Sequence, residues 1–482
     1  MPVHTELLVE TTLTPAQAAH TVVLVGRAAR LQSDQLRAVS PIPAESARRM
    51  LAELDSGDQG AWTCTFVGPR RIVLIVLPEP CSRYNSPSRA WVIPTLLRNA
   101  NIKGDAAIVL AVDESSHAIA ACLAAARAFS RYSARSSPAE TRRVTLTALA
   151  PDGVVDHPSL GAGVDGVRLA ARLFDMPCAA LHTDALVAEA EAVAARTGAT
   201  VRTVLRGEAL RDEGLGGLWG VGKAATRGPA LVLLEKPGAS ADSPTLAWVG
   251  KGLVYDTGGL ALKGKEAMPG MKGDMGGAAA VLGAFEAACR AGVPQRVLAL
   301  LCIAENAIGP DAVRPDDVLT MYSGKTVEVN NPDAEGRLVL SDGLAWLLKN
   351  HVVDEVIDLA TLTGAITGAV GKVHAGVYSN DEGLERALVQ AGRAAGEPLH
   401  PLIFAPELWR KEFKSEIADM KNSVKDRNNA SSAAAAQFIL SHMPEHGCPA
   451  WAHLDIAGTA WDNEGRGTGF GVGVLLERAL SR

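Results

Sequence analysis

Aromatic residues are scarce in this chain, at 4% of 482 residues. Surfaces that stack on bases or sugars are built from aromatic side chains, so this scarcity argues against such a surface. The net charge is −6 at pH 7, which leaves no excess of basic residues to attract a phosphate backbone or an anionic membrane. The composition therefore disfavours nucleic acid and membranes as partners.

Cysteine pairs and long apolar runs are also missing. The seven cysteines include no CxxC pair, and such an unpatterned set is typical of reduced thiols in a reducing compartment. No apolar run approaches the roughly 18 residues that cross a bilayer. Residues 1–17 are too polar and acidic for a signal peptide. Together these absences predict a cytoplasmic protein.

The sequence has ample material for two folded domains. Hydrophobic residues make up 48% and charged residues 21%, the balance of a globular protein, and the length exceeds what one hydrophobic core usually supports. A stretch rich in Gly and Pro at 150–163 interrupts the alternation of strands and helices. We predict a small N-terminal α/β domain at 1–160 and a larger domain at 161–482.

The larger domain alternates apolar strands with helices. Such strands are typical of a sheet covered by helices on both faces, so we predict an α/β domain with a mixed, mostly parallel central sheet flanked by helices. Ligands bind beyond the carboxyl ends of the strands in sheets of this kind. The expected strands are 200–205, 230–234, 245–254, 296–303, 355–359 and 452–456.

The strand expected at 245–254 carries charge where an apolar strand should not. Lys251 lies inside it and Asp256 follows it, while Lys263 comes seven residues later and Asp274 eleven after that. A buried charge without a partner is costly, which suggests a function. For Asp274 an ordinary helix N-cap is the alternative reading, because a helix is expected to start there.

A second polar segment contains Asp333, Glu335, Gly336 and Arg337. Alone it could be a solvated turn with an internal salt bridge, since surface turns often contain Asp-x-Glu. Combined with the first segment, it gives the larger domain four carboxylates and a lysine at expected strand and loop ends. Hard oxygen ligands in this number suit a pair of divalent cations that share carboxylates.

These segments resemble the signatures of the leucyl aminopeptidase (cytosol aminopeptidase) family. Residues 331–338 match its Asn-Thr-Asp-Ala-Glu-Gly-Arg-Leu signature except for Pro332, and the resemblance continues through 360–365 and 451–458. It covers roughly residues 165–482. Lys263-Gly264-Lys265 and the segment 416–423 are most similar to the probable aminopeptidase-like branch of the family.

The resemblance implies a metallo-aminopeptidase with two ions in the larger domain, which would then be the catalytic domain. Zn²⁺ is expected, with Mn²⁺ or Mg²⁺ accepted at the looser site. The tighter ion would be held by Lys251, Asp256, Asp274 and Glu335, and the exchangeable ion by Asp256, Asp333 and Glu335. A lysine ligand must be neutral, and two adjacent dications would lower its pKa.

The resemblance also assigns catalytic roles. Lys263 would stabilise the oxyanion of the tetrahedral intermediate, and Arg337 would hold a bicarbonate ion that serves as the general base. The pocket for the first side chain of a small peptide would be formed by Met271, Thr361, Leu362 and Gly364. Family members of this type assemble as homohexamers.

Two departures from the family pattern concern the loops of the site. Pro332 replaces the usual threonine, and residues 423–429 lack the usual glycines. Lys425 and Arg427 in that loop raise the possibility of a more polar or acidic substrate. His453, inside an expected strand, is interpreted as a core histidine rather than a ligand.

The sequence leaves two other functions as alternatives. The first is an inactive binding or regulatory protein on the same scaffold, which loss of Lys263 or Arg337 would have favoured. The second is a two-metal phosphatase or nuclease. Such sites commonly add histidine ligands, and that reading leaves Lys251 unexplained.

Overall fold

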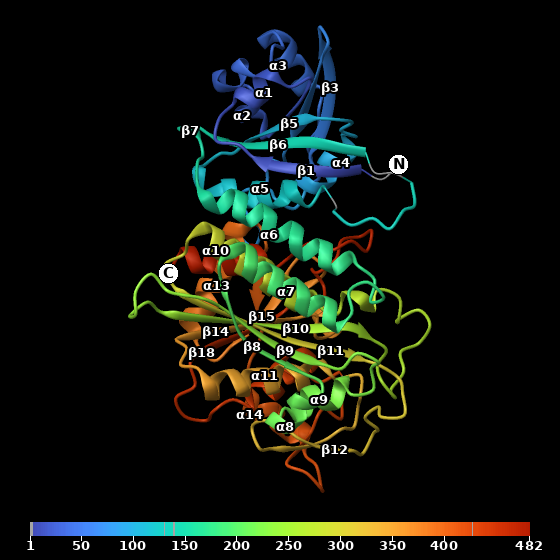
Figure 1. Cartoon of the computed structure of the whole chain (residues 1–482). Helices are drawn as coiled ribbons and strands as arrows, with labels where there is room; N and C mark the ends of the chain where they lie inside the picture. Colours follow the sequence, from blue (N-terminus) through green and yellow to red (C-terminus); the bar gives the residue numbers. More distant parts are fainter. Residues whose placement is uncertain (1–2, 130, 138–139, 427) are drawn as a thin grey trace.

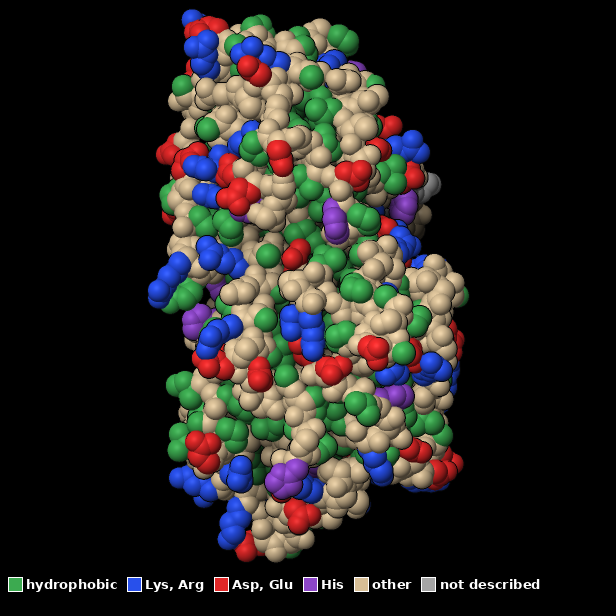
Figure 2. Space-filling model, turned by 90° about the vertical axis from the view of Figure 1, so that its left-hand side faces the viewer, with side chains coloured by type: hydrophobic (Ala, Val, Ile, Leu, Met, Phe, Trp, Pro, Cys, Tyr) green, Lys and Arg blue, Asp and Glu red, His purple; other side chains and the backbone are tan. Residues whose placement is uncertain are grey.

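The computed structural model describes residues 3–129, 131–137, 140–426 and 428–482. Two sheets lie one above the other, with a layer of helices between them (Figure 1). The outer surface mixes charges: on the face in Figure 2, Lys and Arg side chains are interspersed with Asp and Glu. No helix in the described ranges is long and apolar enough to cross a membrane.

The N-terminal sheet has the strand order β1-β6-β5-β2-β4-β3, with β7 paired to β6. Of the five neighbouring strand pairs in this order, four are parallel, and the β3–β4 hairpin is antiparallel. The strands form because short apolar runs are buried between helices, as in β2 and β5, where every residue is buried. The bounds are β1 Val3–Val9, β2 Thr21–Gly26, β3 Ala61–Val67, β4 Arg70–Val76, β5 Ala106–Ala111, β6 Glu140–Ala150 and β7 Gly153–Val154, with helices α1 Thr14–Ala18, α2 Ala28–Leu31, α3 Ala44–Ala52, α4 Ile93–Asn99 and α5 Ala118–Ala126.

Helix α6 (Pro158–Asp175) joins the two sheets. It contacts α5 and β1 on one side and packs along α10 (Gly276–Ala291) on the other. The two helices approach closely where Gly166 faces Gly283: a Cβ on Gly166 would lie 2.4 Å from the Gly283 carbonyl oxygen. The proposed division at residue 160 falls within this helix and stays a prediction.

The larger sheet has the order β16-β15-β18-β14-β10-β11-β9-β8. Its four central strands, β18, β14, β10 and β11, are parallel, and the outer strands include antiparallel pairs. The strands are β8 Thr200–Arg206, β9 Ala230–Lys236, β10 Thr245–Asp256, β11 Arg296–Asn306, β14 Glu355–Ala360, β15 Ala375–Ser379, β16 Leu399–Pro401 and β18 Ala450–Asp455.

Helices cover both faces of this sheet (Figure 1). One set lies between it and the N-terminal sheet: α6, α7 (Thr183–Thr197), α10, α13 (Glu382–Ala395) and α16 (Val472–Leu480). The opposite face is covered by α8 (Glu208–Glu213), α9 (Gly216–Gly222), α11 (Gly336–Asn350) and α15 (Ser431–Leu440). The predicted fold class is confirmed. Sequence reasoning did not anticipate the short edge strand β16, nor a small third sheet of β12 (Val318–Thr320), β13 (Thr326–Glu328) and β17 (Met420–Lys421).

A β-bulge in β10 decides which way its charged residues point. The register with β11 shifts between Leu253 and Tyr255, so Val254 is the extra residue. In a regular strand Lys251 and Asp256, five residues apart, would point to opposite faces. The inserted residue shifts the alternation of side chains by one position. Both Lys251 and Asp256 therefore point toward the face covered by α11.

Candidate metal centre

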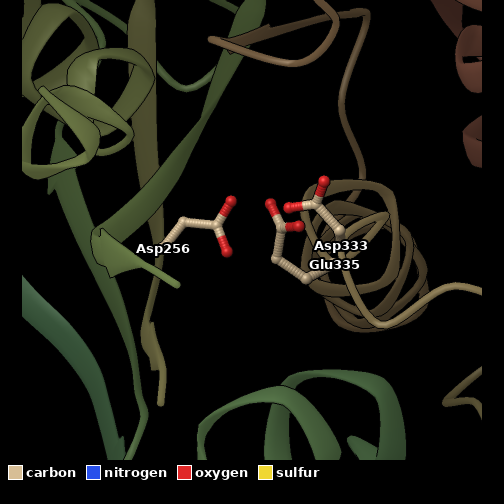
Figure 3. A group of neighbouring side chains, drawn as sticks. All are labelled: Asp256, Asp333 and Glu335. Carbon is tan, nitrogen blue, oxygen red and sulfur yellow. The ribbon is translucent and has the colours of Figure 1, made fainter. Parts of the chain in front are cut away.

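The carboxyl ends of the central parallel strands meet at one edge of the larger sheet. Asp256 ends β10, and Thr361 follows β14. Asp333 and Glu335 lie just before α11, whose first residue is Gly336. Figure 3 shows their carboxylates pointing toward that of Asp256. Ligand atoms of these three residues lie within 4.8 Å of one another.

The first half of the cluster is centred on Lys251, which is 2% exposed. Its Nζ lies 2.8 Å from Asp274 Oδ1 and 2.9 Å from Glu335 Oε1, and it donates to the Thr361 carbonyl at 3.0 Å. Thr361 Oγ1 donates to Asp274 Oδ1 at 2.8 Å. The residues that the resemblance assigns to the tighter ion therefore lie in direct contact, apart from Asp256.

The second half is centred on Lys263. Its Nζ lies 2.7 Å from Asp256 Oδ2 and also contacts Asp333 Oδ1. Asp256 is held by its other oxygen, which accepts from Asn306 Nδ2 at 2.8 Å and from the Gly258 amide at 2.9 Å. Asn306 is a residue that sequence reasoning missed. Its position at the end of β11, on the same sheet edge, was the available signal.

Burial and mutual repulsion of the carboxylates dominate the electrostatics. Burial raises the pKa of Asp274 well above its usual value, against the opposing effect of Lys251. Burial also raises the pKa values of Glu335 and Asp333. Burial alone would lower the pKa of Lys251, but the surrounding carboxylates outweigh it and raise that pKa. Without metal the two lysines are ammonium groups that only partly neutralise the four carboxylates, three of which are buried.

The donor set fits divalent cations. Asp274 Oδ2 and Glu335 Oε2 are buried and have no hydrogen-bond partner among the described residues. A carboxylate oxygen left in this state is costly unless a cation supplies the missing contact. Each orphaned oxygen belongs to a carboxylate that already contacts Lys251 through its other oxygen. A bound cation would displace the Lys251 proton into solvent, and all three groups could then serve as ligands.

The two structural alternatives raised by the sequence do not match this geometry. Asp274 makes no capping bond to α10, which begins at Gly276 after Met275. The Asp333–Glu335 segment is no solvated turn, because Glu335 and Arg337 are 3% and 7% exposed. Gly336 is required for close approach: a Cβ there would lie 2.7 Å from both Cε and Nζ of Lys251.

Arg337 lies behind the carboxylates and is held by a residue to which the sequence gave no role. Its Nη1 donates to the Asn422 carbonyl at 3.1 Å, while its buried Nε has no hydrogen-bond partner in the described ranges. Burial lowers the Arg337 pKa to about 10, which leaves it charged at neutral pH. The Asn422 side chain accepts from the amides of Asn330 and Asn331 and donates to the Asn331 carbonyl, so it fixes the loop that carries Asp333.

The expected pocket residues border the cluster unequally. Thr361 contacts Asp274 and Lys251 directly, and the Asp274 amide donates to the Met271 carbonyl at 3.3 Å. Leu362 is partly buried and Gly364 is exposed. Asp455, at the end of β18, holds this loop in place: it accepts from the amide of Leu362 and, at 2.6 Å, from the hydroxyl of Thr363.

The residues that depart from the family pattern lie in loops. The Pro332 carbonyl accepts from Asn306 Nδ2 at 3.1 Å, and the Asp333 amide donates to Asn331 Oδ1. Lys425 is exposed, and Arg427 lies outside the described residues. His453 is fully buried, and its Nδ1 lies 2.6 Å from Asp358 Oδ1, as expected of a core histidine.

Comparisons with known proteins match both parts of the chain. A profile of the cytosol aminopeptidase family, catalytic domain, matches residues 168–476, and one of the M17 aminopeptidase N-terminal domain 2 matches 20–138. Probable aminopeptidase NPEPL1 of Mus musculus is 48% identical over 409 residues, 83% of this chain and 78% of that protein. Leucine aminopeptidase 1 of Caenorhabditis elegans is 42% identical over 409 residues, with 83% and 81% covered.

Solved structures agree along the whole length. That of the Caenorhabditis elegans leucine aminopeptidase superposes with a TM-score of 0.91 at 35% identity, covering 99% of this chain and 98% of that one. Leucyl aminopeptidase from Trypanosoma brucei, in complex with bestatin, gives 0.90 at 33% identity, covering 100% and 96%. The family and branch indicated by the sequence are thus confirmed: the chain belongs to the cytosol aminopeptidase family, on its NPEPL1-like branch, and is a metalloaminopeptidase.

Proposed function

We propose that this enzyme removes N-terminal residues from small peptides with two divalent ions. The observation that carries the proposal is the largely buried cluster of four carboxylates and two lysines, in which two carboxylate oxygens have no hydrogen-bond partner among the described residues. The five residues proposed as ligands are Lys251, Asp256, Asp274, Asp333 and Glu335. When bound, the two ions would lower the pKa of a shared water and polarise the scissile carbonyl.

Lys263 is proposed to stabilise the oxyanion. Burial alone would lower its pKa, but Asp256 and Asp333 outweigh that effect and raise it, so the side chain remains an ammonium group. It is partly exposed, at 15% of its side chain, so a substrate oxygen can reach it. A preorganised cation at the developing negative charge stabilises the transition state more than the ground state.

Arg337 is proposed to hold bicarbonate as the general base. Within the described residues no histidine is hydrogen-bonded to the four carboxylates, so the cluster has no conventional base of its own. The charged guanidinium, whose Nε has no partner in the described part of the chain, suits a small oxyanion. Such an anion would accept the proton of the attacking water and pass it to the leaving amine.

Substrate choice, metal and assembly complete the proposal. The free α-amino group of a peptide would ligate an ion, which restricts cleavage to N-terminal residues. Met271, Thr361, Leu362 and Gly364 would receive the first side chain, and Lys425 favours polar or acidic substrates. Zn²⁺ or Mn²⁺ is proposed, with Mg²⁺ as a weaker substitute; one structural neighbour, the bottromycin maturation enzyme BotP, is a complex with Mn. A homohexamer and a cytoplasmic location remain predictions; several relatives are named probable cytosol aminopeptidases.

The test is a metal-dependence assay. The purified protein is dialysed against chelator and assayed on a panel of aminoacyl-p-nitroanilides and dipeptides, with Zn²⁺ or Mn²⁺ restored and bestatin as inhibitor. Asp274→Ala should abolish turnover, whereas Asp242→Ala, at an exposed loop carboxylate, should match wild type. Turnover that survives exhaustive chelation, or equal activity of Asp274→Ala, would contradict the two-metal mechanism.

A further inference from the structure

A small cavity lies where the N-terminal part of the chain meets α6. None of the residues that line it belongs to the carboxylate cluster. Its volume is about 140 Å³, enough to hold several water molecules. Its wall contains an unusual concentration of positive charge. Five arginines line it: Arg98, Arg127, Arg131, Arg168 and Arg466.

Carboxylates neutralise only part of this charge. Three of the arginines have partners, in the pairs Arg98–Asp462, Arg127–Glu397 and Arg466–Asp175. Arg131 and Arg168 have no ion pair within the described part of the chain. The remaining acidic residue of the wall, Glu464, is exposed. The cavity therefore keeps an excess of positive charge.

Arg168 is the more informative of the two unpaired arginines. It lies on α6 and is only 3% exposed. Its Nη2 donates to the Thr5 carbonyl, but its buried Nε has no partner among the described residues. Burial and the nearby charge of Arg131 lower its pKa to about 10, against the opposing effect of Asp165, which forms no ion pair with it within the described residues. A buried guanidinium without a counter-ion is costly, so its retention at a cavity wall suggests that an anion completes the site.

We propose that this cavity binds a small tetrahedral oxyanion, of the phosphate or sulfate class, through Arg168 and Arg131. The planar guanidinium donates two parallel hydrogen bonds to such an anion, which is why arginine is favoured over lysine in sites of this kind. The volume admits one such anion together with water.

An anion here would stabilise the junction of the two sheets, and Asp175 connects the wall of the cavity to the turn before Asp274. Arg466 Nε and the Gly467 amide donate to the carboxylate of Asp175, at 3.0 and 2.9 Å. The carbonyl of Asp175 accepts from Lys272, which lies two residues before Asp274. Occupancy of the cavity is thus connected to the turn that positions a proposed metal ligand.

The experiment is a phosphate titration of the metal-depleted full-length protein. Binding is measured by calorimetry, and stability by thermal unfolding at constant ionic strength. Removing metal prevents phosphate from binding at the carboxylate cluster. Wild type should bind phosphate saturably and unfold at a higher temperature with it. Arg168→Met and Arg131→Gln should each weaken binding about tenfold or more, because each removes charge-assisted hydrogen bonds.

Two control variants locate the binding. Arg135→Gln, an exposed arginine of the same segment that does not line the cavity, should bind phosphate as wild type does. So should Arg337→Gln, which tests whether phosphate binds at the proposed bicarbonate position instead. If phosphate gives no more stabilisation than chloride, or if Arg131→Gln binds it as tightly as wild type, the proposal is wrong. The proposal is also wrong if Arg337→Gln loses phosphate binding while the Arg168 and Arg131 variants keep it. Arg131 is exposed, so its variant tests the site even if Arg168→Met fails to fold.

Discussion

Replacing Asp274 by asparagine should affect the metal-free and metal-bound proteins differently. In the metal-free protein Asp274 Oδ1 contacts Lys251 and Thr361, while Oδ2 is buried without a partner in the described ranges. Asparagine keeps an oxygen for both contacts and removes a charge whose burial is costly. Lys251 also keeps Glu335 at 2.9 Å, so no buried charge loses its last partner. We expect the unfolding free energy of the metal-free variant to lie within about 1 kcal/mol of wild type.

With metal the expected difference is larger. An ion at 100 times its Kd stabilises the folded state by about 2.7 kcal/mol. Loss of residues that merely support a ligand costs up to about 100-fold in metal affinity, and loss of a ligand itself should cost at least as much. At the same ion concentration the variant would then gain about 0.4 kcal/mol or less. Wild type should therefore gain about 2.3 kcal/mol more from metal than Asp274→Asn does.

Denaturant unfolding of both proteins, with and without Mn²⁺ or Zn²⁺, measures the two differences directly. The metal concentration is set from the Kd that calorimetry gives for wild type. Equal stabilisation of both proteins by metal would refute the assignment of Asp274 as a ligand. A loss of about 3–5 kcal/mol in the metal-free variant would instead identify Asp274 as a structural partner of Lys251.

Three further predictions test other parts of the structure. Lys263→Met should lower kcat by about 10²–10³-fold with little change in KM, if the ammonium group acts mainly on the oxyanion; a change in KM alone would contradict that role. Gly336→Ala should weaken metal binding at least about tenfold by displacing Lys251, with circular dichroism unchanged, since an added methyl overpacks the site. Burial lowers the pKa of His442 to about 3, so its protonation should destabilise the fold as pH falls from about 6.5, by about 2 kcal/mol at pH 5. His442→Gln should reduce this dependence in denaturant unfolding, while the exposed His446→Gln should not.

The central fold was predictable because its strands carry an unambiguous signal. Runs such as 230–234 and 296–303 are almost wholly apolar and became β9 and β11, buried on both faces. The short strands were not predictable in this way. β16 contains only Leu399–Pro401, and β17 only two residues, so neither is long enough to show a period, and their pairing depends on neighbours distant in sequence.

The candidate site was predictable in composition but not in its supporting contacts. The carboxylates and lysines stand out because charge is rare within apolar strands. Asn422 could not be recognised from the sequence, because its role depends on hydrogen bonds to Asn330 and Asn331, about 90 residues away. The bulge at Val254 was equally hard to place: Gly250 and Gly252 lie in the same strand, but neither is the extra residue that allows Lys251 and Asp256 to share a face.

Helix α6 constrains how the enzyme can be dissected. One side of it packs against the N-terminal part and the other against α10. The helix therefore belongs to the packed interior of both parts and is not a flexible linker. Cutting the chain before Pro158 would leave buried apolar side chains of this helix, such as Leu160 and Val164, facing water. A catalytic fragment would then aggregate unless these apolar side chains were replaced or covered by another protein. The N-terminal part thus buries the apolar outer surface of α6 and so keeps the peptidase domain soluble.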